Sequence, residues 1–89
     1  MPQAVTEITN KLGLHARAAA KLTQQASRFA AEVWLSRGER RVNAKSIMGV
    51  MMLAAGKGSR ITVATEGADA DAALAAILAL VTDKFGESE

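Results

Sequence analysis

The chain has 89 residues, enough for one small domain with one hydrophobic core and too few for a catalytic domain with a separate substrate domain. Hydrophobic residues make up 49% of it and charged residues 22%, which argues against disorder, while the absence of cysteine excludes disulfides and thiolate metal sites. A net charge of +2 indicates no class of partner by itself, so we expect a single globular domain over residues 1–89 and look to the motifs for its function.

The first predicted elements are a strand and a helix. Residues 4–9 mix β-branched side chains with alternating polarity, which predicts a strand, and the loop 10–13 leads from it to His15. Residues 16–30 are rich in alanine and predict an amphipathic helix. Its apolar stripe consists of Ala19, Leu22, Ala26 and Phe29.

A β-hairpin is predicted next. Residues 32–36 alternate in polarity, with Val33 and Leu35 on one face, and a glycine-containing turn connects them to residues 40–43. The two strands should therefore pair side by side in an antiparallel sheet.

Two helices and one strand complete the chain. Ser46 can cap a short helix over about 47–53, and a strand at 60–65 follows a glycine-rich break. Asp69 or Asp71 can start the last helix. Its apolar face falls at positions i, i+3, i+4 and i+7 and consists of Leu74, Ile77, Leu78 and Val81.

The element order is thus βαββαβα. Four antiparallel strands with three helices on one side predict an α+β fold, an open-faced two-layer β-sandwich whose second face meets solvent. The N-terminal MPQAVTEITN lacks the basic region and apolar run of a signal peptide, and no stretch approaches the ~18 apolar residues of a membrane helix. We expect a cytoplasmic protein with no membrane insertion.

His15 is the candidate for chemistry, since it stands between a glycine-containing loop and a helix, at or beside the N-cap. Unpaired backbone N–H groups and the helix dipole favour an anion there, so a phosphate could bind. Imidazole is a nucleophile near neutral pH because much of it is then deprotonated. Arg17 is placed to pair with such an anion, although a solvated arginine is an equal alternative.

The segment from Ser46 onward is the second candidate site. Ser46 is predicted to be an ordinary N-cap residue. A phosphate on Ser46 would add about 1.5–2 negative charges at the start of the helix without unfolding the helix. The helix carries more large apolar side chains than one face can bury, so we expect Ile47, Met48 and Met51 to be exposed, the alternative being internal packing. A group of basic residues in the preceding segment suggests an acidic partner surface, although simple solvated charges are the commoner explanation of such a group: Arg37, Arg40, Arg41 and Lys45.

Two segments of the chain resemble the signature segments of the HPr family, the phosphocarriers of the phosphotransferase system. They are Gly13-Leu14-His15-Ala16-Arg17 and Ala44-Lys45-Ser46-Ile47-Met48-Gly49-Val50-Met51. Length, element order and motif spacing also match, so the resemblance covers essentially the whole chain. It implies that His15 takes a phosphoryl group at ring Nδ1 from phosphoenolpyruvate-charged Enzyme I and passes it to EIIA components, with Arg17 assisting the transfer.

The same resemblance implies roles for the second segment. Ser46 matches the regulatory site that an HPr kinase/phosphorylase modifies in many members, and Ile47, Met48 and Met51 match the partner-binding patch. We expect no cofactor and no metal. The chain is expected to be a monomeric phosphoryl carrier rather than an independent enzyme.

Two positions depart from the family pattern. Ala18 stands where the family usually has proline, which adds a backbone donor and loosens the opening turn of the helix. Leu12 stands where some members carry a polar residue. The opening EITNKLGLHAR also resembles the nitrogen-related (NPr-like) branch, so the sequence leaves the sugar and nitrogen pathways both open.

Two other classes of function compete with a phosphocarrier. A purely regulatory binding module is possible, but family relatives of that kind lack the histidine that this chain has at position 15. An RNA-binding sheet would need several aromatic side chains for stacking. Phe29 belongs to a helical stripe and Phe85 follows the last helix, which leaves Trp34 alone on the open sheet face, so we expect no nucleic-acid partner.

Overall fold

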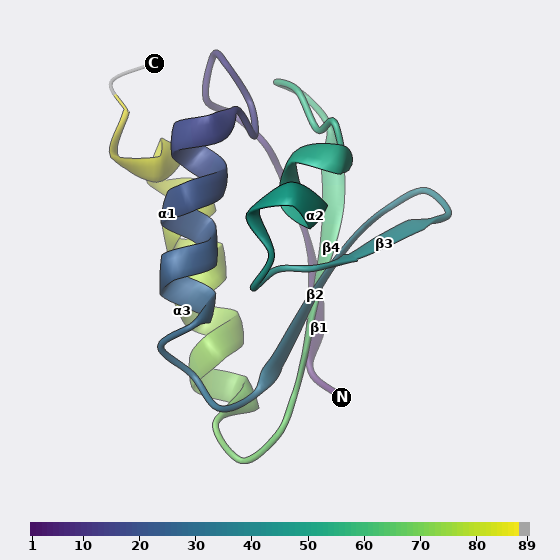
Figure 1. The fold of residues 1–89 in the computed structure, drawn as a ribbon, viewed down its shortest axis with the longest axis vertical. Coiled ribbons are helices and arrows are strands. Elements are labelled where there is room, and N and C mark those ends of the chain that lie inside the picture. The colour runs from purple at the N-terminus through teal and green to yellow at the C-terminus, as the bar shows by residue number, and fades with distance from the viewer. Residues whose placement is uncertain (88–89) are drawn as a thin grey trace.

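The computed structural model describes residues 1–87, and its elements follow the expected order with one short 3₁₀ turn added (Figure 1). The strands are β1 (Gln3–Glu7), β2 (Glu32–Arg37), β3 (Arg40–Asn43) and β4 (Arg60–Glu66). The helices are α1 (Ala16–Ala26), α2 (Ile47–Met52), α3 (Ala70–Thr82) and the 3₁₀ turn η1 (Lys84–Gly86). The predicted βαββαβα order is confirmed.

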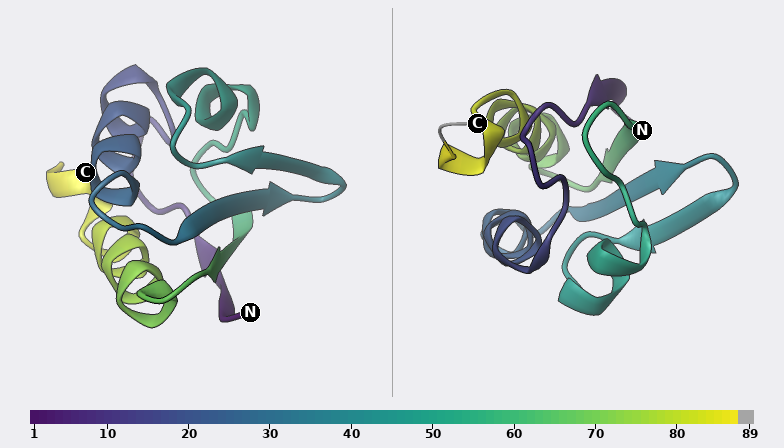
Figure 2. Two further views of the ribbon diagram at one scale, coloured as in Figure 1. Left: turned by 60° about the horizontal axis from the view of Figure 1, so that its bottom comes forward. Right: turned by 90° about the horizontal axis from the view of Figure 1, so that it is seen from above.

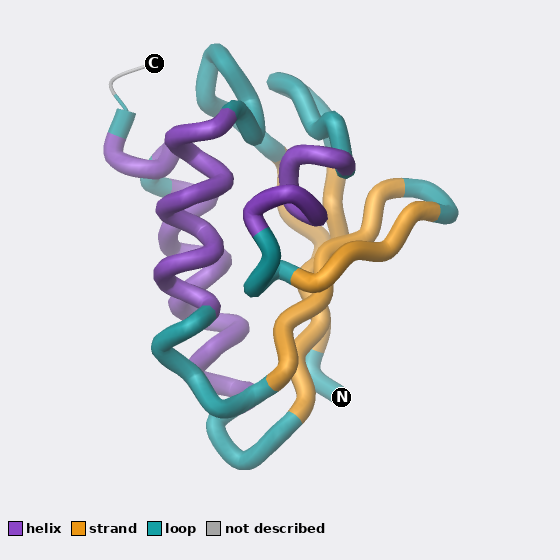
Figure 3. The backbone as a smooth tube through the Cα atoms, in the orientation of Figure 1, coloured by secondary structure: helices purple, strands orange, loops and turns teal. Residues whose placement is uncertain are grey.

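The four strands form one antiparallel sheet in the order β1-β4-β2-β3. β4 lies inside the sheet, where Val63 stands between Ala4 of β1 and Leu35 of β2. Because side chains alternate along a strand, Val33 and Leu35 are buried together on the inner face, as predicted. The three helices cover that face and leave the other open (Figures 2 and 3). The open-faced α+β sandwich is therefore confirmed.

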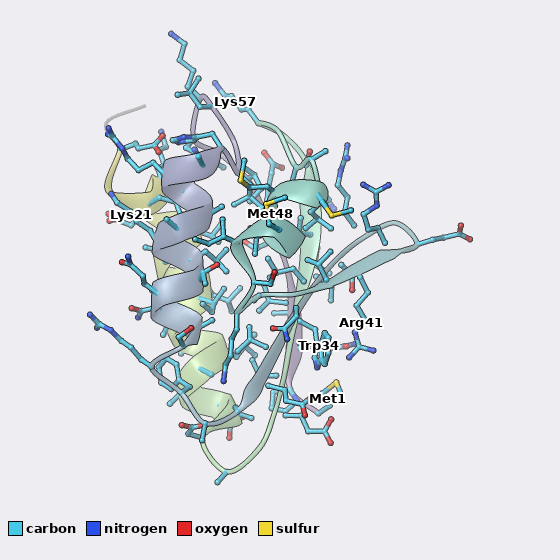
Figure 4. The ribbon with its side chains drawn as sticks, in the orientation of Figure 1. Met1, Lys21, Trp34, Arg41, Met48 and Lys57 are labelled. Carbon is cyan, nitrogen blue, oxygen red and sulfur yellow. The ribbon has the colours of Figure 1, made fainter. Side chains whose placement is uncertain are left out.

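Trp34 lies on the open face of the sheet, opposite in direction to its buried neighbours on β2. The guanidinium carbon of Arg41 stands 4.4 Å from the centre of its ring, so the indole is half-buried beneath a cation (Figure 4). Phe29 is half-buried and Phe85 is fully buried. Trp34 is thus the one aromatic residue that the described residues offer on the open face.

The first helix ends earlier than the sequence predicts. The expected helix over residues 16–30 was wrong at its C-terminal end, since α1 stops at Ala26. The amides of Ala30 and Ala31 donate instead to the two carboxylate oxygens of Asp69, at 2.9 and 2.7 Å. These bonds replace helical ones and draw the chain toward β2. Phe29 still packs against the core, but from a turn rather than from the helix.

The last helix begins after Asp69, one of the two predicted starts, and buries a narrower stripe than expected. Ile77 and Val81 are fully buried, whereas Leu74 and Leu78 are only half-buried at the flanks. Small side chains, Ala70 and Ala73, continue the buried stripe and let the helix approach the sheet closely. None of the helices in the described part of the chain is long and apolar enough to cross a membrane.

Candidate functional site

His15 is the N-cap residue of α1, as the sequence predicts. Its backbone is extended (φ −75°, ψ 178°), and its carbonyl accepts the amide of Ala19 at 2.8 Å. The amides of Ala16, Arg17 and Ala18 precede that first helical bond and have no partner within the helix. The His15 side chain makes no capping bond and is 27% exposed. Within residues 1–87, a partly exposed imidazole and three amides without a hydrogen-bond partner thus share one helix end.

The loop before His15 is held by a close backbone contact with the loop after α2. The amide of Leu14, a buried residue, donates to the carbonyl of Ala55 at 2.9 Å. Gly13 has φ +66°, and a Cβ there would lie 2.6 Å from the same carbonyl oxygen. Only glycine adopts this conformation in so little space. The position of His15 therefore depends on a glycine two residues before it.

Glu87, near the C-terminus, contacts the imidazole directly. Its Oε2 lies 2.6 Å from Nε2 of His15. Its Oε1 accepts a bond of 3.1 Å from the side-chain amide of Asn10, which also donates to the carbonyl of Gly13 at 2.8 Å. The hydrogen bond with His15, aided by the one from Asn10, holds the pKa of the Glu87 carboxyl below its ordinary value. Neither Asn10 nor Glu87 is among the site residues predicted from the sequence.

A left-handed turn brings Glu87 to this position. Lys84, Phe85 and Gly86 have φ values of 56°, 57° and 78°, a conformation that is costly for the first two, which carry a Cβ. The conformational cost of this turn is offset by complete burial of the Phe85 side chain and by a 2.6 Å hydrogen bond that Lys21 Nζ donates to the Phe85 carbonyl. Figure 1 shows the yellow end of the chain beside the first turns of α1.

Arg17 of the motif and the following Ala18 lie in the first turn of α1. Arg17 is exposed, which fits pairing with an external anion and a solvated arginine equally well. Ala18 is fully buried, so the position where the family usually has proline packs against the core while its N–H stays unpaired in the helix. Leu12 is exposed in the loop before the site. No cluster of residues able to hold a metal ion occurs within residues 1–87.

Ser46 is the N-cap of α2, and its exposed hydroxyl oxygen accepts the amide of Gly49 at 3.1 Å. Because α2 buries mainly Val50, its other large side chains remain outside. The exposed set contains the three predicted residues and a fourth that the sequence analysis missed: Ile47 (43%), Met48 (68%), Met51 (40%) and Met52 (61%). We call these four residues the α2 patch (Met48 is labelled in Figure 4).

The basic residues near the α2 patch bind within the molecule. Arg37 and Arg40 donate to backbone carbonyls at the C-terminal end of α2. Lys45 donates to a carbonyl of the turn after α1 at 2.8 Å, and Arg41 covers Trp34. Each of these cations therefore has a structural contact, in addition to any role in attracting an acidic partner.

The chain is similar to a protein family and to several of its known members. Residues 2–83 match the family model described as "PTS HPr component phosphorylation site". The phosphocarrier protein HPr of Cupriavidus necator is 60% identical over 89 residues, covering all of both chains. The phosphocarrier protein NPr of Shewanella violacea is 54% identical over 81 residues, 91% of this chain and 89% of that one. The structure of HPr-C-His from Thermoanaerobacter tengcongensis superposes with a TM-score of 0.97 at 43% identity, covering all of both chains.

Proposed function

Because the chain belongs to the HPr family of phosphocarrier proteins, we propose that it accepts a phosphoryl group on His15 from phospho-Enzyme I and passes it to an EIIA component in the cytoplasm. The observation that carries the proposal is the N-cap position of His15, where a nucleophilic ring and unpaired amides meet. The carrier acts as a monomer and as a substrate of its partners, without turnover of a small molecule of its own.

The transfer step needs a neutral imidazole. The lone pair of Nδ1 attacks phosphorus, and the N–P bond forms as the bond between phosphorus and the donor breaks, with its electron pair leaving on the donor. The amides of Ala16 and Arg17 are available to the phosphoryl oxygens, and the helix dipole favours their negative charge. The Arg17 guanidinium supplies a cation in the same turn. Transfer to the acceptor reverses these changes.

In this proposal, the protein partners dock on the α2 patch. Its three methionines are unbranched and adaptable, which suits a surface that must fit both a donor and several acceptors. Ser46 stands at the edge of this patch as the first residue before α2. An HPr kinase/phosphorylase that modified the Ser46 hydroxyl would add charge beside the patch and weaken docking.

The test is incubation with phosphoenolpyruvate and Enzyme I, followed by measurement of acid-labile phosphate on the protein. The wild type should gain one such phosphate and lose it when an EIIA component is added. His15→Ala should gain none while keeping the circular dichroism spectrum of the wild type. Acid-labile phosphate on the His15→Ala protein would move the acceptor site to another residue.

The nitrogen branch is the second candidate pathway, favoured by the 54% identity to an NPr protein beside the 60% identity to an HPr protein. Initial rates of phosphorylation by sugar-pathway Enzyme I and by its nitrogen-pathway counterpart separate the two. The faster donor identifies the pathway.

A further inference from the structure

The contact between Glu87 and His15 joins two residues 72 positions apart, and Glu87 lies outside the residues 2–83 that match the family model. A carboxylate only accepts hydrogen bonds, so a separation of 2.6 Å from Nε2 requires the proton of the ring to be on Nε2. In the neutral ring the other nitrogen, Nδ1, then carries the free lone pair. The contact thus selects the tautomer that phosphoryl acceptance at Nδ1 needs.

We propose that Glu87 is a positioning residue for phosphoryl acceptance at His15, with Asn10 holding the Glu87 carboxylate in place. The inference rests on the proposed function. When Nδ1 bonds phosphorus and the donor leaves with its electron pair, the imidazole ring gains positive charge and keeps its Nε2 proton. The Glu87 carboxylate faces that proton, so it stabilises the charged ring more than the neutral one.

The hydrogen bonds around Glu87 hold its carboxylate in a defined position next to His15. Asn10 is fully buried, and its amide nitrogen serves two acceptors, the Gly13 carbonyl and Glu87 Oε1. Its own Oδ1 is buried with no hydrogen-bond partner among the described residues, so the amide orientation is set by the two bonds that its nitrogen donates. Asn10 therefore connects the loop that presents His15 to the carboxylate that orients it.

The backbone before Glu87 supports the same conclusion. Two residues with a Cβ, Lys84 and Phe85, adopt left-handed conformations there. The buried Phe85 ring and the bond from Lys21 hold the turn against α1. A tail without a role at the site would not need this conformation, and its effect is to direct Glu87 at the imidazole.

The experiment compares three variants with the wild type. Glu87→Ala removes the acceptor, Glu87→Gln keeps an acceptor oxygen without the charge, and Asp83→Ala is a control that removes a nearby exposed carboxylate. The ¹⁵N chemical shifts of the His15 ring, measured over a pH series that extends to alkaline pH, report which nitrogen carries the proton in the neutral ring. The initial rate of phosphorylation by Enzyme I is measured on the same samples.

We expect the wild type, Asp83→Ala and Glu87→Gln to carry the ring proton on Nε2, and Glu87→Ala to show a mixture of the two tautomers. The phosphorylation rate of Glu87→Ala should fall about tenfold, equivalent to about 1.4 kcal/mol in the activation free energy. Glu87→Gln should be intermediate, because it restores orientation but not charge.

An unchanged tautomer or an unchanged rate in Glu87→Ala would overturn the inference. A lower rate with wild-type ring shifts would also overturn it, since it would reflect only a structural disturbance. The ring shifts do not depend on phosphoryl transfer. If the wild type itself accepts no phosphate, the proposed function fails, and this result is distinguishable from the failure of the positioning role.

Discussion

The helices α1 and α2 both begin after a residue with an extended backbone, but only α2 has one of its first amides capped by the side chain of that residue. At α2 the Ser46 hydroxyl accepts the amide of Gly49, so the helix end is closed by its own side chain. At α1 the His15 side chain makes no capping bond and turns instead to Glu87. A closed end contributes to stability, whereas an open end keeps its donors for a ligand. The comparison indicates that α1 gives up capping energy and leaves its first amides available for the proposed phosphoryl group.

The largest expected effect comes from Gly13→Ala, which disturbs the loop that presents the open end. A left-handed conformation costs roughly 1–2 kcal/mol for a residue with a Cβ. The new Cβ would also approach the Ala55 carbonyl at 2.6 Å, so we expect a total loss above about 2 kcal/mol. Urea denaturation measures it. Gly38→Ala is the matched control, since Gly38 has φ +62° with no atom within 4 Å, and an equal loss in both variants would refute the role of the close contact.

The second prediction removes the cap of the closed end. Ser46→Ala deletes the acceptor for the Gly49 amide and should reduce the free energy of unfolding by about 1 kcal/mol. Ser27→Ala, at an exposed position after α1, is the control and should change it by less than about 0.5 kcal/mol. Equal stability of Ser46→Ala and the wild type would mean that the 3.1 Å bond contributes nothing.

The third prediction closes the open end. His15 already has the extended backbone of an N-cap residue, so His15→Ser should be more stable than His15→Ala by about 1 kcal/mol. Both variants lack the contact with Glu87, which makes the alanine variant the proper reference. Neither should accept acid-labile phosphate. Thermal denaturation of the pair decides, and equal melting temperatures would show that α1 cannot be capped in this way.

The same regions differ in how well the sequence predicts their structure. The periodicity of the apolar residues and the cap at Ser46 gave the element order, the inner face of β2 and three members of the α2 patch. Periodicity is local, however, and it carries no signal for a contact between residues 72 positions apart. Asn10, in a loop beside a glycine, could have been noted as a polar group near the site, whereas nothing in the spacing distinguishes Glu87 from a solvated terminal acid.

The early end of α1 has the same explanation. The stripe from Ala19 to Phe29 keeps its helical spacing, so sequence reasoning continues the helix. The carboxylate that accepts the amides of Ala30 and Ala31 belongs to Asp69, nearly forty residues later. Tertiary hydrogen bonds override the local pattern at this point.

The fourth prediction adds charge to the closed end. Ser46→Asp places a carboxylate at the N-terminus of α2, where the dipole favours it by about 0.3–1 kcal/mol, so the melting temperature should hold or rise slightly. The affinity for Enzyme I should fall, because the charge adds repulsion and desolvation beside Ile47 and Met48. Ser27→Asp is the control and should leave the affinity unchanged. A large loss of stability with unchanged affinity would contradict this prediction.

The smallest effect concerns α3, whose N-cap represents a third arrangement. Asp69 caps nothing in its own helix, and the hydrogen bonds from Ala30 and Ala31 lower its pKa below the ordinary value of 3.8. A lowered pKa stabilises the folded state above pH 3.8, and this contribution is lost as the pH falls through the lowered value. Between about pH 5 and pH 2, Asp69→Asn should therefore lose less stability than the wild type.

The measurement for Asp69→Asn is urea denaturation at several pH values. Asp71→Asn, in the exposed first turn of the same helix, is the control and should follow the wild-type profile. Because Asp69 is partly exposed, salt should weaken the difference. If the stability of Asp69→Asn and of the wild type fell identically with pH, the hydrogen bonds from Ala30 and Ala31 to Asp69 would not be a source of pH dependence.

The place of β4 in the sheet has a consequence for synthesis of the protein. β1 and β2 do not pair with each other, and each pairs with β4, which is translated last of the four strands. At about 5–20 residues per second, roughly 3–10 s separate the end of β1 from the start of β4 on the ribosome. Only the β2–β3 hairpin can form in that interval, so β1 must wait unpaired in the nascent chain until its partner emerges.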